Sequence, residues 1–382
     1  MIRLLYIVAQ PVRWVAFEWI AGTLDPKRFR LSFLLLSEGP PALGPYLDEL
    51  EIPWLHLAIR HRSQVPWLAR RIAEQCRKER IQIVHAHFMN SCLAGLTGAF
   101  LAGVKCRLHT RHHAGPFPSS HRPWWGKFYD QYNNRLSTRI VVPSRQVENV
   151  LVHRERVSLA KLVRIYHGFD LGSFSDVPEI AVELMREKYE LGNRWPVVGV
   201  VARYEEIKGV HFIIEAFHAL LIEQPGACLV LANARGKTMP RIREQLARLP
   251  PDSYREILFE ENMPPLYALF DLFVHAPLAA EFEAFGQVYV EAWAAGIPSI
   301  VTPAGIAAEF AIHERNAYVV GFGESANILA GMKALLAAPR LREGIAEGGR
   351  RLARERFSLS GMVQALEHLY QSENERAPAT CL

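Results

Sequence analysis

The chain has 382 residues, of which 50% are hydrophobic and 22% are charged, and this ordinary globular composition excludes a disordered or fibrous protein. Its length predicts two or three domains. Residues 1–175 hold 24 Lys and Arg against 12 Asp and Glu, whereas residues 176–382 hold 20 against 27. The basic first half therefore either faces an anionic partner or is simply well solvated.

Short apolar runs alternate with amphipathic stretches from the first residues onward. In the first half the predicted strands are Leu4–Val8, Leu31–Leu36, Ile81–Ala86, Cys106–Thr110 and Arg139–Pro143. The first run is too short to span a bilayer and no cleavage pattern follows it, so we expect a buried strand rather than a signal peptide. The segment Gln64–Glu79 predicts a helix whose apolar face carries Trp67, Leu68, Ile72 and Cys76.

The second half repeats this alternation. Its predicted strands are Val197–Ala202, Cys228–Ala232, Ile257–Glu260, Leu272–His275 and Ser299–Thr302. Strands separated by helices favour an α/β fold, and we predict two Rossmann-like, doubly wound parallel-sheet domains that face a central cleft. We place the domains at residues 1–175 and 176–358, and in residues 359–382 we expect a helix that packs back on the first domain, followed by a polar tail.

Two loops at predicted strand ends carry charged residues suited to a nucleotide. A helix that begins near Gly286 offers free N–H groups to a diphosphate. Glu283 before it and Glu291 within it could accept hydrogen bonds from sugar or ribose hydroxyls, although their spacing also fits ordinary surface charges. In the other loop, Arg203 and Lys208 could clamp a diphosphate leaving group, or be two solvated cations.

Several nucleotide and metal signatures are missing from the sequence. It has no GxGxxG or GxxxxGK[ST] motif, which argues against a dehydrogenase or a P-loop kinase. None of its seven aspartates forms an Asp-x-Asp pair, so the usual metal site for a diphosphate is also absent. The five scattered cysteines include no CxxC pair and predict free thiols in a reducing compartment.

Taken together, these stretches resemble the retaining glycosyltransferases of family 4. The family's Glu-x7-Glu signature matches Glu283 and Glu291, with Phe285 and Gly286 between them, and Ala292–Pro298 resembles the stretch that follows it. Any one such match is weak, but their order along nearly the whole chain is specific.

Further elements of the same family lie on both sides of that signature. Its Arg…Lys-Gly element matches Arg203 and Lys208-Gly209, and His167–Asp170 resembles its Asn-Gly-x-Asp turn. In the first half, Val84–His87 and Thr110–His112 resemble strand-end elements that face the acceptor.

The resemblance implies a GT-B fold and a retaining transferase, which moves a sugar from a nucleotide-diphosphate donor to a hydroxyl of a glycan or lipid-linked acceptor. It implies that the first domain binds the acceptor and the second the donor, with no cofactor and no metal. The catalytic residues it implies are His112, Glu283, Arg203 and Lys208. The donor-binding residues it implies are Arg203, Lys208, Glu283, Phe285, Gly286 and Glu291. We expect acceptor-side residues at Arg13, His87, His113 and Trp124.

The sequence also departs from the family pattern. Pro11–Trp14 stands where the family has a Gly-Gly loop, and Asn233–Gly236 replaces a Gly-rich turn. These departures leave open a catalytically inactive nucleotide-sugar-binding protein, and a same-fold sugar-nucleotide epimerase is a further alternative. The basic half also allows nucleic-acid binding, but no recognition motif supports it, and we predict no nucleic-acid partner.

A segment rich in tryptophan and cations suggests a second kind of partner. His121–Lys127 contains two tryptophans beside basic residues, a composition that suits an anionic membrane surface. The same tryptophans could instead stack on sugar rings of the acceptor or pack in the protein core. We expect a cytoplasmic location, with peripheral docking at the inner face of the membrane as a further hypothesis.

Overall fold

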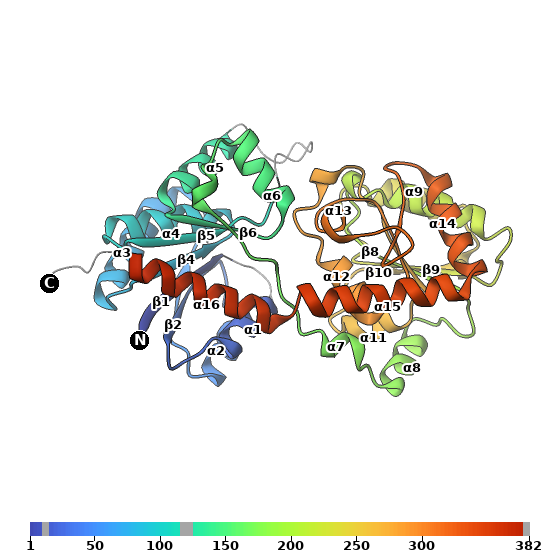
Figure 1. Cartoon of the computed structure of the whole chain (residues 1–382), viewed down its shortest axis with the longest axis horizontal. Helices are drawn as coiled ribbons and strands as arrows, with labels where there is room; N and C mark the ends of the chain where they lie inside the picture. The colour runs from blue at the N-terminus through green and yellow to red at the C-terminus, as the bar shows by residue number, and fades with distance from the viewer. Residues whose placement is uncertain (10–14, 115–124, 377–382) are drawn as a thin grey trace. The chain divides into compact units, whose positions relative to one another are not determined.

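The structure is a computed structural model that describes residues 1–9, 15–114 and 125–376. The chain divides into two compact units (Figure 1). The first comprises Met1–Gly168 and Leu359–Leu382, and the second comprises Phe169–Ser358.

In the described residues, the first unit contains a seven-stranded sheet in the order β3-β2-β1-β4-β5-β6-β7, and every neighbouring pair is parallel. The strands are β1 (Ile2–Ala9), β2 (Phe29–Ser37), β3 (Trp54–Ala58), β4 (Ile83–His87), β5 (Cys106–Thr110), β6 (Arg139–Val142) and β7 (Leu162–Arg164). The helices are α1 (Val15–Thr23), α2 (Gly44–Glu49), α3 (Val65–Lys78), α4 (Met89–Leu101), α5 (Trp125–Leu136), α6 (Arg145–Asn149) and α16 (Leu359–Arg376).

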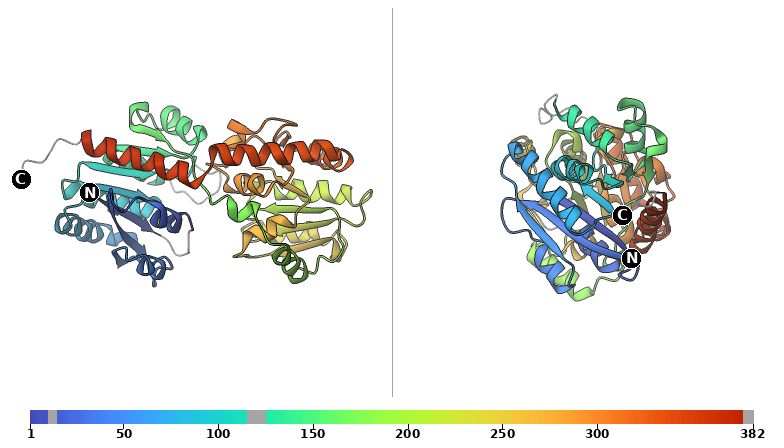
Figure 2. Two further views of the ribbon diagram at one scale, coloured as in Figure 1. Left: turned by 60° about the horizontal axis from the view of Figure 1, so that its bottom comes forward. Right: turned by 90° about the vertical axis from the view of Figure 1, so that its left-hand side faces the viewer.

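Helices cover both faces of this sheet. Successive residues of a strand point to opposite faces, so neighbouring residues of β1 pack against different helices. Leu4 and Tyr6 of β1 pack with α1, α2 and α16, whereas Leu5 and Ile7 pack with α3 and α4. Figure 2 shows α16, in dark red, running along the strands of this unit.

Buried hydrogen bonds also tie α16 to the sheet. The hydroxyl of Tyr370 lies 2.5 Å from the Tyr6 hydroxyl and 2.7 Å from Nδ1 of His85, whose Nε2 lies 2.9 Å from the Thr110 hydroxyl. Residues 359–376 are therefore an integral part of the first unit.

The second unit contains a six-stranded parallel sheet in its described residues, in the order β10-β9-β8-β11-β12-β13. The strands are β8 (Val197–Val201), β9 (Cys228–Ala232), β10 (Tyr254–Ile257), β11 (Leu272–His275), β12 (Ser299–Val301) and β13 (Tyr318–Val319). The helices are α7 (Gly172–Ser175), α8 (Glu179–Lys188), α9 (Val210–Leu220), α10 (Met239–Leu246), α11 (Met263–Ala268), α12 (Gln287–Ala295), α13 (Ala307–Phe310), α14 (Ser325–Ala337) and α15 (Pro339–Arg356).

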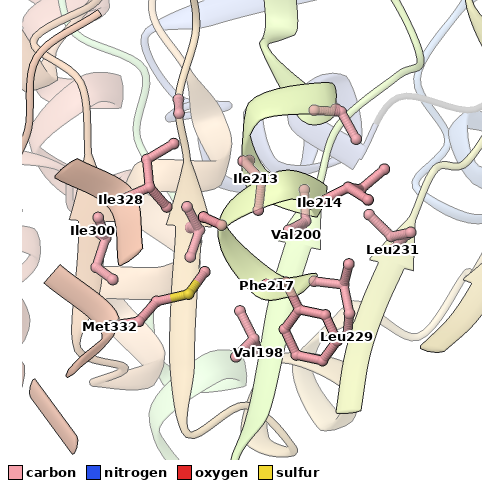
Figure 3. Close-up of a cluster of buried hydrophobic side chains, with 14 of the residues drawn as sticks. Val198, Val200, Ile213, Ile214, Phe217, Leu229, Leu231, Ile300, Ile328 and Met332 are labelled. Carbon is pink, nitrogen blue, oxygen red and sulfur yellow. The ribbon is translucent and has the colours of Figure 1, made fainter. Parts of the chain in front are cut away.

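The core of this unit lies between the sheet and α9, α10 and α14. Val198 and Val200 of β8 pack beneath Phe217 of α9 and Met332 of α14 (Figure 3). On the opposite face, the ring of Phe273 in β11 contacts Tyr267 of α11. Because both faces are buried, the strands are continuously apolar rather than alternating.

The predicted α/β class with two doubly wound parallel sheets is confirmed, but one strand prediction is wrong. The strand expected at Ile257–Glu260 is Tyr254–Ile257, and Leu258 and Phe259 are exposed beyond its end. A run of apolar residues predicts a strand whether or not it pairs with a neighbour. The end of β10 at Ile257 is set instead by its pairing with β9.

One residue of the predicted α3 face is also misplaced. Leu68, Ile72 and Cys76 are buried as expected, but Trp67 is exposed. Trp67 and Leu68 are adjacent, so they lie about 100° apart around the helix, and only one of them can point straight at the core.

Candidate active site

Each sheet has one point at which the winding of the chain reverses. This point lies between β1 and β4 in the first unit and between β8 and β11 in the second. Ligands of parallel α/β sheets bind outside the carboxyl ends of the strands at such a point. In the second unit, the loops after β8 and β11 carry Arg203, Lys208 and Glu283.

Glu283 is the most heavily engaged of these residues. Its Oε1 atom accepts a hydrogen bond from the Lys208 ammonium group, and Nε2 of His275 lies 2.9 Å from the same oxygen. The side chains of Lys208 and Glu283 are only 15% and 10% exposed. No described residue donates a hydrogen bond to Oε2, so this oxygen is available to a ligand.

The surroundings of Glu283 and His275 determine the protonation states of both side chains. Burial alone would raise the pKa of Glu283, but the Lys208 charge and the His275 hydrogen bond outweigh it and lower the pKa to about 2. Burial lowers the pKa of His275 despite its carboxylate neighbour, so the ring is neutral at pH 7. Since an ionised carboxylate only accepts hydrogen bonds, Nε2 carries the proton, and the bare Nδ1 has no partner within the described structure.

The loops that carry these residues are joined through their backbones. Gly209 has a φ of +66° at the start of α9, and a Cβ there would lie 2.1 Å from the carbonyl oxygen of Ala276. The N–H of Leu278 donates to the carbonyl of Ile207 at 3.0 Å. Lys208 is thereby held against the segment that follows β11, and only glycine fits at the point of closest approach.

Glu291 lies on α12 in a different environment. The Tyr267 hydroxyl donates to its Oε2 at 2.7 Å, and no described residue bonds to its Oε1. Burial raises the pKa of Glu291, and the Tyr267 hydrogen bond opposes this only in part. Gly286, with a φ of +87°, lies between the buried Phe285 and the first residue of α12, and no side chain caps this helix start in the described structure.

Arg203 is exposed, and its side chain forms no hydrogen bond or ion pair with any other residue that the structure describes. A second exposed cation, Arg235, was not among the predicted site residues. Arg235 lies in the loop after β9, and its carbonyl accepts a hydrogen bond from the N–H of Tyr204 at 2.9 Å. Its position just after a predicted strand, within the turn Asn233–Gly236, is the signal that could have revealed it.

In the first unit, neutral histidines gather at the carboxyl ends of β4 and β5. The ring of His112 stacks on Phe88 at 4.7 Å and on His167 at 5.7 Å, and its Nε2 lies 3.3 Å from Nδ1 of His87. Burial lowers the pKa values of His87 and His112, and that of His167 to about 4. Phe88 has a φ of +68°, which is unusual for a residue other than glycine.

His113 contacts a separate ion-pair network. Its Nε2 lies 3.3 Å from Asp130, which pairs with the buried Arg111 at 3.1 Å, and Arg111 also pairs with Glu155. The other two expected acceptor-side residues, Arg13 and Trp124, lie outside the described residues.

Two family models match this chain. The model of Glycosyltransferase Family 4 matches residues 27–173, and that of Glycosyl transferases group 1 matches residues 182–352. The chain belongs to glycosyltransferase family 4. This confirms the resemblance drawn from the motifs, while the roles of individual residues stay predictions.

The fold of this family 4 member is similar to that of solved GT-B glycosyltransferases. The structure of HepE from Anabaena in complex with UDP and glucose has a TM-score of 0.84 at 20% identity, over 97% of this chain and 100% of that one. A glycosyltransferase from Rickettsia africae has a TM-score of 0.82 at 20% identity, over 98% and 99% of the two chains.

Among curated proteins, a GDP-mannose-dependent alpha-(1-6)-phosphatidylinositol monomannoside mannosyltransferase of Mycolicibacterium smegmatis is 26% identical over 226 residues, which is 58% of this chain and 59% of that protein. The chain spans roughly half to two thirds of the length of the curated relatives it matches. None of the helices in the described part of the chain combines the length and apolar character needed to cross a bilayer.

Proposed function

We propose that this family 4 member is a retaining glycosyltransferase that moves a sugar from a nucleotide-diphosphate donor to a hydroxyl of a glycan or lipid-linked acceptor. The arrangement around Glu283 supports this most directly. One oxygen of an ionised, buried carboxylate is held by Lys208 and His275, and the other is open. Such an oxygen suits the O–H donors of a sugar.

The neighbouring groups suit the rest of a nucleotide-sugar donor. The exposed guanidinium of Arg203 and the uncapped start of α12, with the N–H groups that follow Phe285 and Gly286, would bind the diphosphate. Glu291, whose Oε1 is open, would accept hydrogen bonds from the ribose hydroxyls.

In the proposed reaction, the bond between the anomeric carbon and the diphosphate oxygen breaks, and the acceptor oxygen bonds to the same face of that carbon. The acceptor's proton passes to the leaving diphosphate, so no enzymic base is required. Arg203 and Lys208 offset the charge that develops on the leaving group, and we assign neutral His112 a hydrogen bond to the reacting sugar.

We further propose that the reaction uses no cofactor or metal ion, since Arg203 and Lys208 would supply the positive charge with which a metal otherwise balances a diphosphate. Transfer should then persist in excess EDTA. Loss of transfer in EDTA that magnesium or manganese restores would overturn this part of the proposal.

The test begins with a panel of nucleotide sugars in a thermal-shift screen. Each ligand that raises Tm is assayed for hydrolysis and for transfer to glycan and lipid-linked acceptors, with NMR of the product anomer. Glu283→Gln should abolish most turnover, whereas Glu244→Gln, an exposed change in the same unit, should leave it unchanged. Binding without turnover would favour an inactive sugar-nucleotide-binding protein, and an isomerised sugar nucleotide would favour an epimerase.

For the acceptor side, we propose a cytoplasmic protein that docks peripherally on an anionic membrane. On the first unit α4 packs between α3 and α5 (Figure 1). Phe100 of α4 and Phe128 of α5 are 56% and 61% exposed, and the Arg107 guanidinium lies 5.4 Å from the Phe100 ring centre. An exposed aromatic ring beside a cation suits the interface of an anionic bilayer.

Vesicle co-sedimentation over a salt series tests this docking. Binding should prefer anionic over neutral lipid and should weaken as salt rises, because the Debye length is only about 8 Å at physiological ionic strength. Phe128→Ala should weaken binding, and Ile222→Ala, an exposed apolar change on the second unit, serves as the control. Equal affinity for both lipids at low salt would overturn the proposal in favour of a soluble acceptor.

A further inference from the structure

Glu283 lies in a loop whose backbone does not by itself fix the orientation of the Glu283 side chain. It directly follows the short 3-10 helix η6 (Ala280–Phe282) and has extended backbone angles, with a φ of −118° and a ψ of 129°. A carboxylate on such a loop can rotate about its side-chain bonds unless neighbouring groups hold it. For one oxygen to face a ligand consistently, the other must be anchored.

His275 is held far more rigidly. It is the last residue of β11, it is 1% exposed, and it pairs with Val301 of β12. Its ring packs edge-on against Tyr289 at 5.0 Å and lies nearly parallel to the Phe273 ring at 6.3 Å. The position of Nε2 is therefore set by the sheet and by two buried aromatic rings.

We propose that His275 is a positioning residue for Glu283. The N–H at Nε2 of His275 anchors Oε1 of Glu283, so that Oε2 of Glu283 faces the sugar hydroxyls of the donor. The kinetic side of this inference rests on the proposed function. Lys208 bonds to the same oxygen, but its ammonium group ends a long stem from the 3-10 helix η4 (Glu206–Lys208). Lys208 supplies the compensating charge, whereas His275 sets the orientation of the Glu283 carboxylate.

The unpartnered Nδ1 of His275 supports this division of roles. It is buried, and no described group donates to it. A histidine kept only to satisfy the core would be expected to use both ring nitrogens. Here the ring is engaged through the one nitrogen that faces Glu283.

Two substitutions separate positioning from packing. His275→Gln places an amide N–H near the position of Nε2, and His275→Leu fills the space without a donor. We expect His275→Leu to lower kcat roughly tenfold to a hundredfold, the effect of losing a hydrogen bond to a charged group, with the KM of the donor changed less than about threefold. His275→Gln should recover most of the rate. His218→Leu, an exposed change on α9, is the matched control.

Wild-type kcat in folded His275→Leu, or a glutamine variant no faster than the leucine variant, would overturn the inference while leaving the proposed function intact. Nitrogen-15 NMR of the imidazole tests it without any turnover. At pH 7 we expect Nε2 protonated and Nδ1 bare, with the resonances assigned by their loss in His275→Gln. A neutral ring that carries its proton on Nδ1, with Nε2 bare, would refute the anchoring hydrogen bond. A wild-type protein that turns over no nucleotide sugar would refute the proposed function alone.

Discussion

Replacing Lys208 with methionine should destabilise the second unit, and the additional replacement of Glu283 with glutamine should restore part of the loss. The Lys208 and Glu283 side chains are only 15% and 10% exposed, so a carboxylate left alone would stay in the protein interior. Its pKa of about 2 lies well below the ordinary value of 4.5 despite burial. At about 1.36 kcal/mol per pKa unit, the site as a whole, with the opposing effect of burial included, favours the charged form by about 3 kcal/mol.

The expected free energies follow from this pairing. Removing one partner of a buried ion pair typically costs about 3–5 kcal/mol, because the remaining charge is uncompensated. The double variant Lys208→Met/Glu283→Gln carries neither charge, and its amide oxygen can still accept the hydrogen bond from His275. We therefore expect the double variant to be about 1–2 kcal/mol more stable than Lys208→Met alone.

Hydrogen-exchange mass spectrometry at pH 7 can measure this in one unit at a time, by following peptides from β8 and β11. Lys333→Met is the matched control, because Lys333 pairs with Glu223 at the surface, where such a change should cost under about 1 kcal/mol. A double variant no more stable than Lys208→Met would show that Glu283 does not depend on Lys208 for its charge, and the proposed site would lose its main support.

Three further predictions concern other parts of the structure. Tyr267→Phe should raise the KM of the donor roughly threefold to tenfold with little change in kcat, since it frees the carboxylate of Glu291, and an unchanged KM would contradict this. Arg111→Met leaves the carboxylates of Asp130 and Glu155 without their buried cation and should lower the free energy of unfolding by about 3–5 kcal/mol, which calorimetry would show as a Tm lower by about 10 °C. A shift under about 3 °C would show that this ion-pair network is dispensable for stability. Gly209→Ala should destabilise the second unit by at least about 1 kcal/mol in urea unfolding, whereas Gly192→Ala, at a similar φ of +49° but in open space, should cost less; equal losses would refute the steric argument.

Much of the fold could be predicted because buried parallel strands are continuous apolar runs with polar ends. Cys106–Thr110, Cys228–Ala232 and Leu272–His275 match the observed strands at both ends. Strands β3, β7 and β13 were missed, and β7 and β13 have only three and two residues. Such strands are defined by hydrogen bonds to a neighbour distant in sequence, so the local pattern does not reveal them.

The candidate site was predictable as a set of residues but not as a set of contacts. Lys208 and Glu283 are 75 positions apart, and nothing in either loop specifies that the two side chains meet. His275 stood in the sequence as a polar residue at the end of an apolar strand. Its partner became apparent only when the loop after β11 was placed back over the strand end.

The two glutamates of the family signature also turn out to be electrostatically unlike, which their eight-residue spacing conceals. The charge of Lys208 and the bond from His275 lower the pKa of Glu283, whereas burial raises the pKa of Glu291, which has only the neutral hydroxyl of Tyr267 as a partner. Environments that move the pKa values of two carboxyl groups in opposite directions suit the two groups to different tasks. Glu283 is then a fixed negative charge beside the cation that would meet the leaving diphosphate, while Glu291 is an acceptor with little charge compensation. For this reason we expect losses at Glu283 chiefly in kcat and losses at Glu291 chiefly in donor affinity.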